Sequence, residues 1–74
     1  MSARELQDLL RDVIEELIDV REDSDDPLAE LAERAEPIRE IATYDDLGIM
    51  TSDHGLVVEC NDDVEFQIPI VRSR

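Results

Sequence analysis

The sequence lacks several features that commonly stabilise a small domain or give it a function. Cys60 is its only cysteine, so no internal disulfide can form, and its only two glycines, Gly48 and Gly55, do not make a glycine-rich phosphate-binding loop. A chain of 74 residues hides only about 60% of its unfolded surface on folding, so we expect marginal stability. Because a disulfide is excluded, association with a partner chain is the expected source of further stability.

Lysine is absent as well. All seven basic residues are arginines, and 21 acidic residues bring the net charge to −14. In this composition the chain resembles proteins of halophiles that work in molar potassium chloride, where acidic surfaces keep proteins in solution. The acids are spread along the chain rather than gathered in a tail, which indicates adaptation to the solvent. At molar salt the Debye length is only about 3 Å, so acidity does not exclude a nucleic-acid partner, but it gives no positive support for one.

Long apolar runs are missing too. The first residues lead directly into an amphipathic segment, and uninterrupted apolar stretches are only a few residues long. We therefore expect neither a secretory signal nor a membrane span, and no membrane partner. A single cysteine fits a reducing compartment, so we expect a cytoplasmic protein.

The strongest pattern in the chain is a helical one, at residues 3–22. Ser2 and Glu5 match a capping box, which marks the helix start. The apolar residues that follow recur at steps of three, four and seven, which places them on one side of a helix. They are Leu6, Leu9, Leu10, Val13, Ile14, Leu17 and Ile18. With Val20 the stripe covers about half the circumference, which is wide for contact with a single neighbour.

A second helix is predicted at residues 27–43. Asp26 can cap it and Pro27 suits its first position. Its apolar residues keep a spacing near 3.5 and suit packing on the first helix; they are Leu28, Leu31, Ala35, Ile38 and Ala42. Pro37 removes one backbone donor, so the helix either kinks there or restarts. Because the apolar spacing carries through Pro37, we predict a continuous or kinked helix.

The remainder, residues 47–71, changes to an alternating pattern and predicts a β-meander, with strands at 48–51, 56–60 and 64–70. The apolar residues of the last strand are predicted to face the first helix: Val64, Phe66, Ile68 and Ile70. Pro69 cannot donate to a ladder, which predicts an edge strand. The expected fold is one α+β domain, residues 1–74, in which two antiparallel helices pack on a small three-stranded antiparallel sheet (ααβββ).

No motif in the chain predicts a reaction. His54 and Cys60 would lie about 20 Å apart on an extended strand, too far for a catalytic pair, and they are too few for a zinc site unless a dimer axis completes it. The acidic clusters at 45–46 and 61–63 lack the spacing of a calcium-binding loop. We therefore expect no enzyme, no cofactor and no metal site.

The apolar stripe of the first helix is the remaining functional candidate. It is either plain core or, together with the last strand, an interface for a second copy or another protein. The candidate interface residues are Leu6, Leu10, Val13, Leu17, Val20, Ile68 and Ile70. We favour an interaction or assembly module that acts as a homodimer. The alternative is a winged-helix-like DNA-binding regulator, with residues 37–43 as recognition helix and Arg72 and Arg74 near phosphates.

Overall fold

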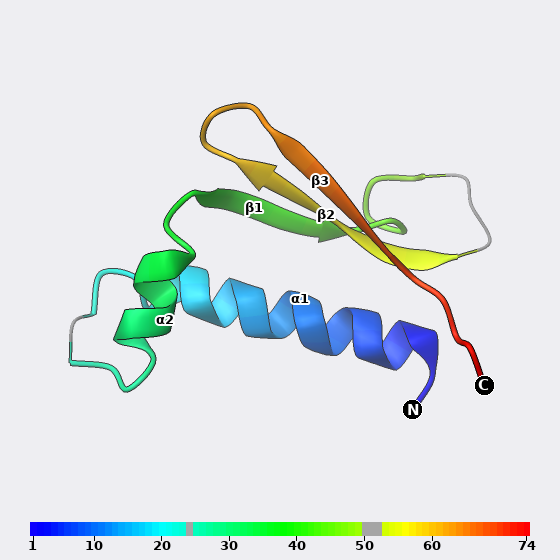
Figure 1. Ribbon diagram of the computed structural model, residues 1–74, viewed down its shortest axis with the longest axis horizontal. Helices are drawn as coiled ribbons and strands as arrows, with labels where there is room; N and C mark the ends of the chain where they lie inside the picture. Colours follow the sequence, from blue (N-terminus) through cyan, green and yellow to red (C-terminus); the bar gives the residue numbers. More distant parts are fainter. Residues whose placement is uncertain (24, 50–52) are drawn as a thin grey trace.

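The fold is a long helix laid on a three-stranded sheet, with a short second helix at one end (Figure 1). The computed structural model describes residues 1–23, 25–49 and 53–74. Its elements are α1 (Ala3–Asp19), α2 (Ala29–Arg34), β1 (Ile38–Thr43), β2 (His54–Cys60) and β3 (Glu65–Ile70). The sheet is antiparallel in the order β1-β2-β3. The predicted α+β class and the order ααβββ are thus confirmed.

Helix α1 begins where the capping box predicts. The Ser2 hydroxyl accepts from the Glu5 N–H at 3.1 Å, and the Glu5 carboxylate accepts from the Ser2 N–H at 3.3 Å. The helix ends at Asp19, three residues earlier than predicted. Its last turn carries no basic side chain to offset the negative end of the helix dipole. Arg21 lies just beyond, where its side chain binds backbone carbonyls of later segments.

The prediction of a helix over residues 27–43 is wrong beyond Arg34. Helix α2 covers only Ala29–Arg34, and Ile38–Thr43 forms strand β1. Pro37 neither kinks a helix nor starts a new one. It disfavours the helical conformation at the residue before it, and the Ile38 N–H turns back to the Ala35 carbonyl at 2.9 Å. The β-branched residues that follow suit a strand.

The strand predicted at residues 48–51 is not found in its described part. Gly48 has φ +66 and lies in a turn, and Ile49 donates its N–H to the Tyr44 carbonyl at 3.0 Å. Residues 50 and 51 lie outside the described residues. The other two predicted strands are present as β2 and β3. The turn between them includes Asp63 at φ 65, a conformation that aspartate tolerates better than most residues.

The core lies between α1 and the first two strands. It consists of Ile41, Leu56, Val58 and Cys60, with Ile14 and Ile38 packed against them. Because directly paired residues share a face, Ile41 and Val58 both point toward α1. Helix α2 packs against α1 rather than on the sheet. The strands are therefore covered by α1 alone, and not by the predicted layer of two helices.

Candidate interaction surface

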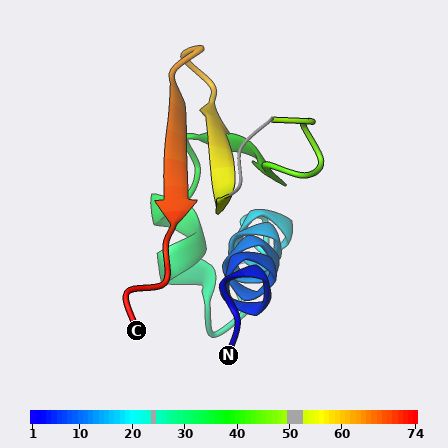
Figure 2. The same ribbon diagram turned by 90° about the vertical axis from the view of Figure 1, so that its right-hand side faces the viewer.

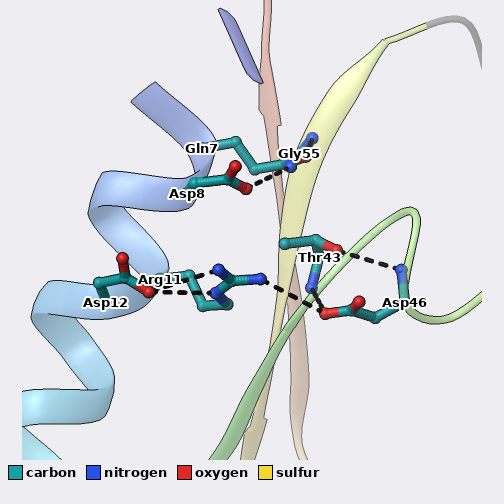
Figure 3. Close-up of polar contacts among 7 residues, drawn as sticks. All are labelled: Gln7, Asp8, Arg11, Asp12, Thr43, Asp46 and Gly55. Atoms are coloured by element: carbon teal, nitrogen blue, oxygen red, sulfur yellow. Dashed lines mark hydrogen bonds and ion pairs between the residues drawn. The ribbon is translucent and has the colours of Figure 1, made fainter. Parts of the chain in front are cut away.

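A buried glutamine sets the position of α1 on the sheet. Gln7 is 1% exposed, and its Oε1 accepts from the Gly55 N–H at 2.9 Å (Figure 3). Strand β1 ends beside Gly55. The Tyr44 N–H still donates to the Gly55 carbonyl at 3.0 Å. The Tyr44 carbonyl, which would accept from the Gly55 N–H in a regular ladder, accepts from the Ile49 N–H instead. The Gly55 N–H is therefore left without a strand partner, and Gln7 supplies the acceptor.

Arg11 ties the same side of α1 to the segment after β1. Its Nη1 lies 3.8 Å from Asp46 Oδ2, and its Nε and Nη2 donate to Asp12 Oδ1 at 3.4 Å (Figure 3). Asp46 in turn accepts from the Thr43 N–H at 3.3 Å. Desolvation lowers the pKa of Arg11, but the hydrogen bond to Asp12 and the nearby carboxylate charges outweigh it and raise that pKa. Arg11 is therefore always charged and holds α1 beside β1.

These two contacts turn the apolar stripe of α1 away from the sheet. At about 100° per residue, Ile14 and Ile18 lie within about 20° of Gln7 around the helix axis. The centre of the stripe formed by Leu6, Leu10, Val13 and Leu17 lies about 90° further round. Accordingly Leu10 is 37% and Val13 48% exposed, although both belong to the densest apolar pattern of the chain.

The stripe faces the β3 side of the molecule. Arg11 reaches the segment after β1 on one side of the helix, whereas on the other side Leu6 lines a hollow of about 180 Å³ with Ile70 and Val71. Viewed end on, α1 lies below the sheet, and β3 forms the edge away from residues 44–49 (Figure 2). The structure thus brings the predicted interface residues Leu6 and Ile70 together.

Strand β3 presents apolar residues on the same side as α1. Phe66 pairs with Val58 and Ile68 with Leu56, so both point to the face that α1 covers. The predicted orientation is therefore found, but α1 lies mainly along β1 and β2 and leaves Phe66 56% and Ile68 41% exposed. We call the following residues the apolar face: Leu6, Leu10, Val13 and Leu17 of α1, and Phe66, Ile68 and Ile70 of β3.

Some residues around the apolar face differ from the predicted set. Val20, predicted as an interface residue, is the half-buried C-cap of α1. Leu28 and Leu31 were predicted to pack on the first helix, but both are exposed, Leu28 at the N-cap of α2 and Leu31 within it. Ala35, from the same predicted set, is buried, and so is Ala32. Phe66 was absent from the predicted interface, although its place in the alternating pattern of the last strand could have identified it.

The molecule is more open than its size requires. A folded chain of 8.5 kDa is expected to expose about 4,650 Å², whereas this one exposes 5540 Å², an excess of about 900 Å². Its radius of gyration is 13.4 Å, against about 11 Å for a compact domain of this length. Both values are larger than those expected for a compact chain of this length.

The structure does not bring His54 and Cys60 together. His54 and Cys60 lie at opposite ends of β2, about 20 Å apart for an extended strand. Within the described residues, no group of three or more potential ligands could hold a metal ion. The clefts near Arg21 are lined mainly by acids, and Arg21 itself is engaged by the carbonyls of Ala35, Glu36 and Ile38 at 3.3, 2.9 and 2.8 Å.

Two wider searches complete the description of the surface. In the described part of the chain, neither helix is long and apolar enough to cross a membrane. Comparison with protein-family models, with curated proteins and with solved structures finds no match. The functional argument therefore rests on the apolar face itself.

Proposed function

We propose that this chain is a non-enzymatic protein-interaction module that assembles as a homodimer through its apolar face. The observation that carries the proposal is the orientation of α1. This helix buries Gln7 against the sheet and leaves Leu10 and Val13 in solvent. Large exposed apolar patches on soluble proteins mark interaction sites, because leaving them in water costs free energy that contact with a partner recovers.

A second copy offers the same apolar face to the first. Stable interfaces bury about 800 Å² on each partner, and Leu10, Val13, Phe66 and Ile68 expose 37%, 48%, 56% and 41% of their surface on this face. A two-fold dimer uses the same patch on both copies, so an apolar patch is self-complementary. The charge of −14 on each copy opposes association in dilute buffer, but a Debye length of about 3 Å in molar salt screens that repulsion.

The DNA-binding alternative receives no such support. The segment expected to form a recognition helix is instead strand β1, Ile38–Thr43. Its arginine, Arg39, contacts Glu59 at 3.3 Å and Asp63 at 3.7 Å. Without a helix at this position, the geometry of a winged-helix reader is not available to these residues, and we do not propose this function.

A charged substitution on the apolar face tests the proposal. Leu10→Asp places a carboxylate in the proposed contact, and Leu47→Asp, at an exposed leucine outside the apolar face, is the matched control. In molar potassium chloride, sedimentation equilibrium should show a dimer for the parent and for Leu47→Asp, and a monomer with parent-like helix content for Leu10→Asp. A Leu10→Asp protein that stays dimeric would contradict the proposal.

A further inference from the structure

We propose that the two copies join through the free edge of β3, so that two three-stranded sheets form one six-stranded antiparallel sheet around a two-fold axis at Gln67. This inference rests on the proposed homodimer and adds the strand and the register of the contact.

The two edges of the sheet differ in how well they are closed. At the β1 edge, Thr43 donates its N–H to Asp46 and accepts from the Leu47 N–H at 3.3 Å, while the Ile38 carbonyl accepts from Arg21. The register also shifts between Ile38 and Glu40, which indicates a bulge. Such features prevent pairing with another strand. Strand β3 keeps an unshifted register with β2 along its whole length.

The ladder shows which backbone groups of β3 point outward. The Cys60 N–H donates to the Val64 carbonyl at 2.8 Å, so these residues form a hydrogen-bonded pair. Bonded and non-bonded pairs alternate in an antiparallel ladder, so Phe66, Ile68 and Ile70 bond to β2. The backbone groups of Glu65, Gln67 and Pro69 therefore face the free edge. The missing N–H of Pro69 interrupts no bond to β2 but leaves the free edge with two outward donors, those of Glu65 and Gln67.

Two antiparallel registers place an acceptor opposite both outward N–H groups, one centred on Gln67 and one centred on Phe66, and the side chains decide between them. With Gln67 opposite Gln67 of the partner subunit, these two residues exchange two hydrogen bonds. The Glu65 N–H then donates to the carbonyl of Pro69 of the partner subunit. By symmetry, Glu65 of the partner subunit donates to the Pro69 carbonyl. In the register centred on Gln67, Pro69 accepts through its carbonyl but has no N–H to donate, so the carbonyl of Glu65 of the partner subunit receives no bond from it.

The same register matches the side chains. On the α1 side, Phe66 lies opposite Ile68 of the partner subunit, and Ile70 lies opposite Val64 of the partner subunit. This register therefore pairs all four of these apolar residues with one another. A register centred on Phe66 would instead leave Ile70 opposite the turn at residues 61–63 of the partner subunit.

The joined sheet also accounts for the orientation of α1. A two-fold axis perpendicular to the sheet keeps both copies of α1 on one face. Because the stripe of α1 points to the β3 side, the two stripes turn toward each other, with the apolar side chains of both β3 strands between them. The apolar faces of both copies then line one shared layer of side chains, on the face of the joined sheet that carries the two α1 helices.

Self-crosslinking at the axis tests the register. Directly opposite residues of a bonded pair have Cα atoms about 5.5 Å apart, which a disulfide can span, so Gln67→Cys should form a covalent dimer under mild oxidation. In the matched Glu65→Cys variant, the two cysteines would lie more than about 13 Å apart along the strands and should stay reduced. Cys60 is buried and present in every variant, so the parent controls for it.

Gln67→Pro gives a second, independent readout. It removes an outward N–H without breaking a bond to β2, so it should yield a folded monomer by circular dichroism and light scattering. Crosslinked Gln67→Cys together with monomeric Gln67→Pro supports strand pairing. A dimeric parent in which Gln67→Cys stays reduced and Gln67→Pro stays dimeric overturns the pairing but not the homodimer. Crosslinking of Glu65→Cys in place of Gln67→Cys overturns the register, and a monomeric parent overturns both proposals.

Discussion

Replacing Gln7 with methionine isolates the contact that sets the position of α1. Methionine has a similar length and volume, so the substitution removes the acceptor for the Gly55 N–H without leaving a large cavity. The Gly55 N–H is then buried without a partner. Leaving a buried donor unsatisfied costs about 1–3 kcal/mol, and we expect the free energy of unfolding to fall by that amount.

This loss is large for so small a domain. A chain of this length has a total stability of roughly 4–11 kcal/mol, at about 0.05–0.15 kcal/mol per residue. With a urea m-value near 1 kcal/mol/M, the unfolding midpoint should fall by roughly 1–3 M. The assay is urea unfolding followed by circular dichroism in molar potassium chloride. All variants must be compared at one protein concentration, because dimer stability depends on it.

Glu16→Met is the matched control for Gln7→Met. It places the same side chain on the same helix at an exposed position, where substitutions usually change stability by less than about 0.5 kcal/mol. If Gln7→Met were as stable as Glu16→Met, the hydrogen bond to Gly55 would not be what positions α1, and the explanation for its exposed stripe would fail.

Three further predictions follow from the same contacts and from the charge. Gly55→Ala places a methyl group 2.5 Å from the Tyr44 ring and should lower the free energy of unfolding in urea by about 1–3 kcal/mol. The control Gly48→Ala should cost less, roughly 1 kcal/mol, because Gly48 has open space around it and only its φ of +66 disfavours alanine. Arg21→Ala removes four side-chain hydrogen bonds to backbone carbonyls and should cost about 2–3 kcal/mol, of which Arg21→Lys recovers only part. Equal stability of all three proteins would refute this role. Raising potassium chloride from 0.1 to 2 M should raise Tm in calorimetry, since salt screens the repulsion among the 21 acids, and an unchanged Tm would contradict the expected salt adaptation.

The parts of the fold that depend on local signals could be predicted from the sequence. The start of α1 follows from Ser2 and Glu5, which are three residues apart. Strands β2 and β3 follow from alternation over a few residues, and Pro69 marks an edge because the ladder requires donors. Strand β1 was missed because Ile38 and Ala42 also continue the spacing of a helix, and Pro37 was read as a kink rather than as the end of the helical pattern.

The orientation of α1 could not be predicted from local pattern. It depends on Gln7 meeting Gly55, 48 positions along the chain, and on Arg11 meeting the segment after β1. The stripe alone predicts that its centre faces the core. Only the long-range polar contacts show that the helix is rotated, and this rotation leaves Leu10 and Val13 exposed and makes the apolar face a candidate interface.

The most direct test of the account is the molar mass of the parent chain by light scattering in molar potassium chloride, over a range of concentrations. The account predicts twice the 8.5 kDa of one chain. It also predicts that dilution or lower salt shifts this value toward a single chain. A mass of one chain at every concentration and salt level would contradict the claim that the apolar face joins two copies.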